Sequence, residues 1–199
     1  MFERQSALTG ALQLGGHDGA SGLRQLRLGE ARDWELVQIA AFAQSLDALE
    51  EAVRPLLSAD LPARVGEAVV AGERCLMKTG PMQFWIISRG NEDLARPLRA
   101  AITTDTGAVT PLSHSRTCIF IEGSRARELL AQGMALDLHL ESFRTNSFAL
   151  TNLHHTPVLL HRSGESRYEL YAMRTFALSI WEWLIDAALP YGYEVVKTG

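Results

Sequence analysis

The C-terminal helix, predicted to begin at Thr175, constrains the fold most strongly because most of its surface is apolar. At about 100° per residue, Ser179, Glu182 and Asp186 fall in one narrow stripe. The residues around that stripe form an apolar arc of about 220°, roughly twice what a helix on one sheet needs. Two arrangements satisfy such a helix. Either it is wedged between layers of its own domain, or a second polypeptide covers one flank.

The second arrangement identifies a candidate partner interface on this helix. Large aromatic residues are enriched at interface cores, so the flank of Leu178, Trp181 and Ile185 is the expected contact surface. On this hypothesis Trp181→Ala weakens association far more than folding. Further interface candidates are residues that carry apolar bulk or hydrogen-bond donors on faces expected to be exposed. The full set of candidates is Ser113, His114, Arg116, Leu178, Trp181, Trp183 and Ile185.

Upstream of this helix, the sequence predicts an α+β fold with an internal repeat. A strand at 34–42 precedes a helix that begins at Ser45, a hairpin follows around Gly80-Pro81, and a second helix runs to residue 102. This order, with a closing strand from 107–122, is that of a ferredoxin-like (split β-α-β) unit, and the second half of the chain repeats it. We therefore expect three segments packed as one compact body: a flexible N-terminal arm (1–32), a first unit (33–106) and a second unit (107–199).

Composition argues against several classes of partner. The 199 residues carry 19 Lys+Arg against 23 Asp+Glu, a net charge of −4, so the basic footprint of a nucleic-acid-binding protein is missing. The longest stretch without formal charge, Thr145 to His161, contains Asn, His and Pro and does not predict a membrane span. Cys75 and Cys118 are too few for a disulfide framework, which predicts a cytoplasmic protein with reduced thiols.

Two groups of residues suggest chemistry, and neither forms a convincing site. Ser113 and His114 are adjacent, so on a strand they point to opposite faces and cannot readily act as nucleophile and base. His154, His155 and His161 lack a carboxylate or cysteine at ligand spacing, which disfavours a metal site. We therefore expect no catalytic, cofactor-binding or metal-binding residue in this chain.

The second half of the chain resembles the gamma subunit of heterotetrameric sarcosine oxidase. The likeness is strongest over 109–195 and weaker, though collinear, from Leu28 to residue 102. It rests on several short motifs in the expected order, which are residues 109–133 (VTPLSHSRTCIFIEGSRARELLAQG), 136–139 (LDLH), 158–162 (VLLHR), 168–171 (YELY), 174–176 (RTF) and 181–189 (WEWLIDAAL), with Phe143, Ser147, Leu153 and His155 between them.

This resemblance implies a subunit of a four-chain flavin enzyme that oxidatively demethylates sarcosine to glycine. In that family the beta chain carries the substrate site, FAD and covalent FMN. The alpha chain binds NAD and has a domain that uses tetrahydrofolate, and the delta chain holds zinc. The gamma chain has no assigned catalytic residue, so the resemblance implies that this chain is inactive alone and assembles with alpha, beta and delta subunits.

The family fold is similar to the N-terminal folate-binding domain of the glycine-cleavage aminomethyltransferase and of the tRNA-modification GTPase. This likeness raises an alternative, a folate-binding or aminomethyltransferase-like one-carbon module acting alone. Two positions argue against it. Aminomethyltransferases have an Asp where this chain has Pro111, and paired Asp residues where it has Asn152 to Pro157. Without those carboxylates, the pterin's donor nitrogens have no obvious partner.

Overall fold

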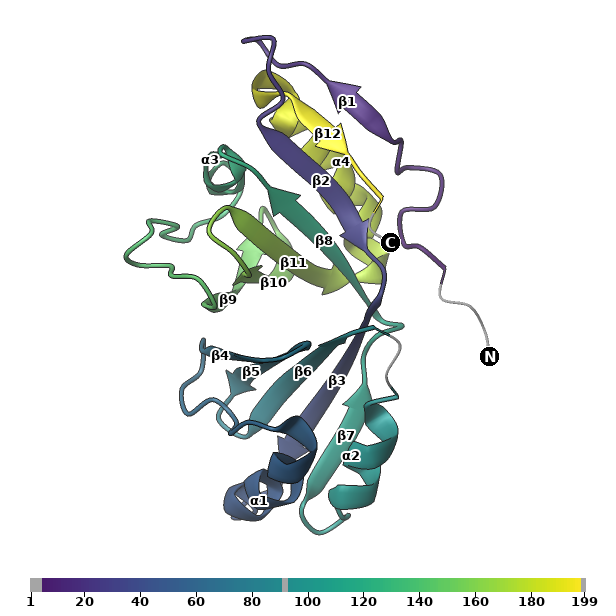
Figure 1. Cartoon of the computed structure of the whole chain (residues 1–199), viewed down its shortest axis with the longest axis vertical. Helices are drawn as coiled ribbons and strands as arrows, with labels where there is room; N and C mark the ends of the chain where they lie inside the picture. Colours follow the sequence, from purple (N-terminus) through teal and green to yellow (C-terminus); the bar gives the residue numbers. More distant parts are fainter. Residues whose placement is uncertain (1–4, 91–92, 198–199) are drawn as a thin grey trace. The chain divides into compact units, whose positions relative to one another are not determined.

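The computed structural model describes residues 5–90 and 93–197, which form two units. The continuous unit is residues 33–113, and the discontinuous unit combines residues 1–32 with 114–199. Each unit has its own sheet and its own hydrophobic core. Figure 1 shows the helices and strands of both units. The fold is α+β with two ferredoxin-like units, as the sequence predicts.

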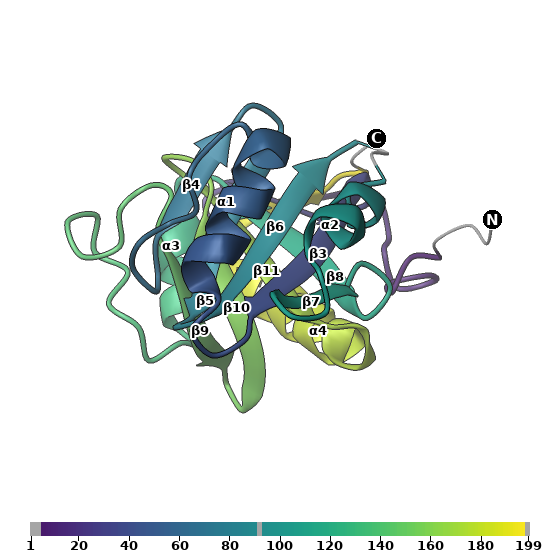
Figure 2. The ribbon, with the colours of Figure 1, turned by 90° about the horizontal axis from the view of Figure 1, so that it is seen from below.

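The continuous unit is a five-stranded antiparallel sheet in the order β4-β5-β6-β3-β7. Within it, the order β5-β6-β3-β7 is that of a ferredoxin-like unit, and β4 is an added edge strand. Helices α1 and α2 cover one face of this sheet (Figure 2). The elements are β3 (Trp34–Ala41), α1 (Leu46–Leu57), β4 (Ala68–Ala71), β5 (Arg74–Gly80), β6 (Gln83–Arg89), α2 (Ala95–Ala101) and β7 (Gly107–Pro111).

Helical periodicity explains how α1 packs in this unit. Leu49, Val53 and Leu57 recur every four residues and are fully or almost fully buried against β3 and β6 residues of the same core. Ser58 ends the helix in the left-handed conformation, with φ of 56°. The core of this unit is therefore formed by one apolar stripe of each helix and one face of the sheet.

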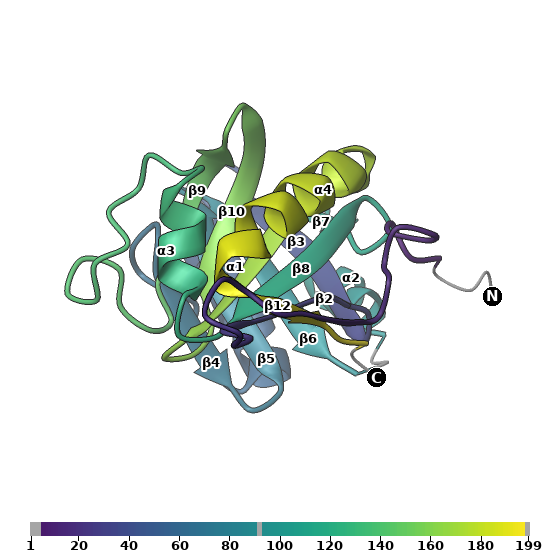
Figure 3. The same cartoon turned by 90° about the horizontal axis from the view of Figure 1, so that it is seen from above.

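The discontinuous unit is a seven-stranded sheet in the order β1-β12-β2-β8-β11-β10-β9. Helices α3 and α4 lie over the same face of that sheet (Figure 3). Its elements are β1 (Gly15–His17), β2 (Leu26–Ala31), β8 (Arg116–Glu122), α3 (Ala126–Ala131), β9 (Phe148–Leu153), β10 (Thr156–Arg162), β11 (Arg167–Met173), α4 (Ala177–Ala188) and β12 (Tyr193–Val195), with short 3-10 turns at Arg174–Phe176 and Leu189–Tyr191.

The fourth strand of this ferredoxin-like unit comes from the beginning of the chain. The order β2-β8-β11-β10 matches the order β7-β3-β6-β5 of the continuous unit, so β2 occupies the position that β7 occupies there. Strand β2 pairs antiparallel with β8 and parallel with β12. The C-terminal strand β12, which follows α4, is therefore displaced one position outward.

This arrangement corrects two of the expected domain boundaries. Residues 26–31, expected in a flexible arm, form an inner strand whose Leu26 and Leu28 are at most 1% exposed. Two alternating leucines beside Gly29 are too short a pattern to identify as a strand from sequence alone. The boundary expected between residues 106 and 107 lies instead at Ser113, because β7 pairs with β3. Residues 1–4 of the expected arm lie outside the described residues.

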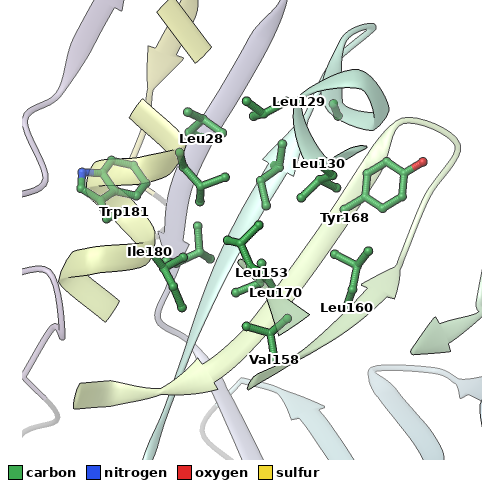
Figure 4. Close-up of a cluster of buried hydrophobic side chains, with 14 of the residues drawn as sticks. Leu28, Leu129, Leu130, Leu153, Val158, Leu160, Tyr168, Leu170, Ile180 and Trp181 are labelled. Carbon is green, nitrogen blue, oxygen red and sulfur yellow. The ribbon is translucent and has the colours of Figure 1, made fainter. Parts of the chain in front are cut away.

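The core of the discontinuous unit lies between its sheet and its two helices. Side chains from β2, β8, β10 and β11 meet those of α3 and α4 there (Figure 4). The labelled members of this cluster are Leu28, Leu129, Leu130, Leu153, Val158, Leu160, Tyr168, Leu170, Ile180 and Trp181.

Within the ranges that the structure describes, no helix has the length and apolar character required to cross a bilayer.

Candidate subunit interface

Helix α4 has the polar stripe that the sequence predicts. Ser179, Glu182 and Asp186 are all exposed. Between this stripe and the buried face lie two partly exposed flanks. Leu178 and Ile185 occupy one flank, and Trp183 occupies the other. The helix is therefore covered by its own unit on one face only, and the two flanks require separate descriptions.

A groove of about 490 Å³ runs along the flank of Leu178 and Ile185. Leu178 is 48% exposed, and Leu14 on the other side is 60% exposed. We call this surface the α4 groove. It is lined by residue 11, residues 13–17, Leu178, Trp181, Glu182, Ile185, Tyr193 and Val195.

The α4 groove has polar groups beside its apolar ones. Glu182 is an exposed carboxylate on the helix side. His17 stacks on Tyr193, with ring centroids 5.6 Å apart and an interplanar angle of 21°. Gly15 and Gly16 belong to the edge strand β1, so the groove also borders a strand without side chains at those positions. The arrangement is suited to binding an apolar surface with polar groups at its rim.

The expectation that Trp181 is exposed is wrong. Its side chain is 3% exposed and belongs to the core of the discontinuous unit, next to Ile180 in Figure 4. The reason is that residues 7–12, expected in the arm, cover this flank: Leu8 is 1% exposed in the same cluster, and Ala11 lines the groove beside Trp181. Trp181 thus forms part of the groove floor and is not a protruding anchor.

Glu30 of β2 holds this covering segment in place. Its carboxylate accepts hydrogen bonds from the Ser6 hydroxyl and from the Ala7 backbone N–H, the latter at 3.0 Å. It also accepts one from Thr117 Oγ1 of β8 at 3.1 Å. Glu30 is only 5% exposed, and a buried carboxylate needs such donors. The carboxylate therefore fixes the start of the segment that covers Trp181.

Trp183 lies on the opposite flank of α4, at a separate cavity. The cavity measures about 260 Å³ and includes Leu153, His154 and Ile180. The His154 ring meets Trp183 edge-on, with centroids 5.1 Å apart and an angle of 72°. A Cβ at Gly133 would lie 2.8 Å from the Trp183 ring, so this glycine permits the close packing. The structure therefore does not bring Trp183 together with Leu178 and Ile185.

Ser113, another predicted interface residue, forms hydrogen bonds within the continuous unit. Its Oγ accepts a hydrogen bond from the Leu36 backbone N–H at 2.9 Å and donates one to the Leu36 carbonyl at 3.3 Å. These bonds extend the pairing of β7 with β3, so the hydroxyl completes the sheet of the continuous unit. Sequence reasoning missed this role because β3 and Ser113 are far apart in the chain.

His114 and Arg116 belong to the discontinuous unit. His114 is exposed, and Arg116 begins β8 opposite Met173, close to the turn that leads into α4. Partial burial lowers the pKa of the Arg116 guanidinium from its ordinary value. Its Nη1 donates to Ser115 Oγ at 3.2 Å. Their role as interface residues stays a prediction.

The histidines considered for metal binding do not gather. His154 contacts Trp183, whereas His161 Nδ1 lies 3.7 Å from Glu169 Oε2 on another part of the sheet. Glu169 Oε2 also accepts a hydrogen bond from the Tyr171 hydroxyl at 2.7 Å. Across residues 5–90 and 93–197, no three metal-ligating side chains come together. Sequence reasoning missed Leu14 and His17, because the glycine-rich segment before β2 has no apolar period. It missed Tyr193 because the pairing of β12 with β1 joins opposite ends of the chain.

Comparison with known proteins identifies the family. A family described as "Sarcosine oxidase, gamma subunit family" matches residues 41–189. A sarcosine oxidase subunit gamma from Corynebacterium sp. strain U-96 is 35% identical over 130 residues, covering 64% of this chain and 62% of that protein. The chain thus aligns with slightly less than two thirds of that relative. One from Arthrobacter sp. is 30% identical and covers 95% of this chain and 90% of that protein.

Two solved structures have a similar fold. A chain of the heterotetrameric sarcosine oxidase from Corynebacterium sp. U-96, in complex with pyrrole 2-carboxylate, matches with a TM-score of 0.82 and 26% identity, covering 98% of this chain and 99% of that one. The glycine cleavage system aminomethyltransferase T from Bartonella henselae matches at 0.65 and 16% identity, covering 87% of this chain and 48% of that one. The latter likeness shows the fold alone. By the family match over residues 41–189, the chain belongs to the sarcosine oxidase gamma subunit family.

Proposed function

We propose that this chain is the structural gamma subunit of a heterotetrameric, flavin-dependent sarcosine oxidase, the enzyme that demethylates sarcosine to glycine. The observation that carries the proposal is the match to a chain of a solved heterotetrameric sarcosine oxidase, which covers 98% of this chain and 99% of the other at a TM-score of 0.82. Family membership over residues 41–189 supports the same function.

In the proposed complex, the chemistry takes place on other subunits. The family resemblance implies alpha, beta and delta partners that hold FAD, FMN, NAD, tetrahydrofolate and zinc. The gamma chain braces the flavin-bearing and folate-bearing chains, and by itself it is inactive. Flavin carries the oxidation in such enzymes, and the protein supplies binding and orientation. The complex, like its gamma chain, is proposed to be cytoplasmic.

The α4 groove is the proposed docking surface for one of these subunits. Leu14 and Leu178 expose apolar area on opposite sides of it, and Ile185 is half-buried between them and the core. The exposed stripe of α4 carries Glu182 and Asp186 and no basic residue. We therefore propose that the partner surface presents apolar side chains rimmed by lysine or arginine, which would meet this acidic stripe.

A substitution in the groove tests this proposal. Leu178 is an exposed residue in the first turn of α4, where an aspartate is compatible with the helix dipole. When the chain is co-expressed with the other subunits of its oxidase, Leu178→Asp should reduce the yield of purified flavin-containing complex by about tenfold or more. Because the residue is exposed, the urea midpoint of the isolated chain should barely change.

The matched control is Leu140→Asp, which places the same charge on a leucine that is 49% exposed and lies outside the groove. It should leave the yield of complex unchanged. Normal assembly of Leu178→Asp would rule out the α4 groove as the docking surface. If the wild-type chain purifies without flavin-containing chains, the proposed function is wrong. Tetrahydrofolate binding with turnover of a methylated amine by the chain alone would favour the one-carbon module instead.

A further inference from the structure

The outer edge of β9 is a second surface that the proposed function does not use. Strand β9 is the last strand of the seven-stranded sheet, and it pairs only with β10 among the described strands. It runs for six residues, Phe148–Leu153, with the sequence FALTNL. It lies inside the longest stretch of the chain without formal charge, Thr145 to His161.

The register of β9 against β10 defines which backbone groups face outward. The Arg162 N–H donates to the Ser147 carbonyl at 2.9 Å, and antiparallel pairs alternate between bonded and non-bonded. The pairs of Ala149 with Leu160 and Thr151 with Val158 are therefore the bonded ones. Pro157 has no N–H and lies opposite Asn152, at a non-bonded position, as this alternation requires.

The N–H and C=O groups of Phe148, Leu150 and Asn152 consequently point away from β10. Among the hydrogen bonds within residues 5–90 and 93–197, none involves these six backbone groups. Leu150, in the middle of the row, has a side chain that is 58% exposed. Phe148 is only 4% exposed, whereas Leu150 and Asn152 are exposed. The accessible part of the edge therefore offers the N–H and C=O groups of Leu150 and Asn152, beside the apolar side chain of Leu150.

The other sheet edges in the structure are shorter or interrupted. Strand β1 has three residues and a glycine with φ of 127°, and β7 ends at Pro111. Strand β4 has four residues. Proteins protect exposed edges with short strands, proline, lysine or bulges, and β9 has none of these in its six residues. An edge that lacks such protection is suited to being covered in the assembled protein.

We propose that an extended segment of a partner subunit adds to β9 as an eighth strand of this sheet. Its backbone pairs with Leu150 and Asn152, and it places an apolar side chain beside Leu150. This inference rests on the proposed function, because a subunit that holds two other chains together needs a second contact surface besides the α4 groove. The occupant is a partner and not a second copy, since the gamma chain occurs once in the proposed complex.

Hydrogen exchange at single-residue resolution tests this pairing in the wild-type protein. In the isolated chain, the amides of Leu150 and Asn152 should exchange fast, and those of Ala149 and Thr151 should be slow. In the purified complex all four should be slow, with protection of the first two rising at least about tenfold. Unchanged exchange of the Leu150 and Asn152 amides in an intact complex would overturn the inference and leave the proposed function standing.

A proline substitution tests the same pairing by a different route. Because the Leu150 N–H faces outward, Leu150→Pro removes an edge donor without removing a bond to β10. It should lower the yield of complex by about tenfold, whereas Leu150→Thr, which keeps the N–H, should assemble nearly as well as wild type. Equal loss with both variants would overturn the inference, because it would assign the contact to the side chain alone.

Two further outcomes separate the alternatives. If protection of Leu150 and Asn152 appears in the isolated chain as its concentration rises, β9 pairs with a second copy and the inference is wrong. If no complex forms with the wild-type chain, the proposed function and this inference fail together. A complex that forms with an unprotected β9 edge removes the inference only, so the two failures are distinguishable.

Discussion

In the continuous unit the fourth strand, β7, follows α2 directly and pairs with β3. In the discontinuous unit the same position beside β8 is occupied by β2, and the whole continuous unit lies between β2 and β8 in the chain. The two units thus have the same strand order and different sources for one strand. The discontinuous unit depends on the first part of the chain, both for β2 and for the segment that covers Trp181.

The largest expected effect concerns that covering segment. Trp181→Ala should reduce the free energy of unfolding by about 3–5 kcal/mol, since it removes a large side chain that is 3% exposed in the core. Leu178→Ala, at an exposed position on the same flank of α4, should change the free energy of unfolding by less than about 0.5 kcal/mol. Urea denaturation of both variants measures the difference. A Trp181→Ala variant as stable as wild type would mean that residues 7–12 do not cover this flank.

A second substitution tests whether β2 is an inner strand. Leu28 is fully buried between β8 and β12, so Leu28→Ala should cost about 2–5 kcal/mol of unfolding free energy. Arg27, whose side chain is 55% exposed on the other face of the same strand, provides the control. Arg27→Ala should be near neutral. Equal, small effects of both substitutions would contradict the position of β2 and favour an arm.

The smallest expected effect concerns two glycines, one in the fourth strand of each unit. A Cβ on Gly29 of β2 would lie 2.4 Å from the Val196 carbonyl oxygen, and one on Gly107 of β7 would lie 2.4 Å from that of Ala40. Gly29→Ala and Gly107→Ala should each destabilise the chain by about 1–3 kcal/mol, because backbone must shift.

Gly80→Ala is the control for this pair, since its Cβ would meet only Gln83 at an ordinary 3.5 Å. It should leave the urea midpoint nearly unchanged. If Gly107→Ala is destabilising and Gly29→Ala is not, β2 is packed less tightly than β7, and the comparison of the two fourth strands does not hold.

The sequence predicts the local features of this protein well. The stripe of Ser179, Glu182 and Asp186 is exposed as expected, because helical periodicity depends only on neighbours along the chain. The α+β class and the two ferredoxin-like units are likewise confirmed, since each helix and hairpin has its own apolar pattern and turn residues.

The errors arise where distant segments meet. Strand β2 has only Leu26 and Leu28 to mark it, and its pairing with β8 joins residues about ninety positions apart in the chain. The exposure of Trp181 was predicted from the helix alone, and the residues that cover it come from the other end of the chain. The hydrogen bonds between Ser113 and the Leu36 backbone were likewise not predicted, and the interface role of Ser113 stays a prediction. The periodicity of apolar residues reports only on neighbours along the chain, so it cannot predict contacts between distant segments.

The central claim is that this chain is one subunit of a flavin-dependent oxidase. The most direct test is native mass spectrometry of the protein purified from its own cells, with the flavin absorbance recorded on the same sample. We predict a particle in which this 21.9 kDa chain occurs once together with larger, yellow chains. A colourless species with the mass of the single chain, or of copies of it alone, would contradict the account.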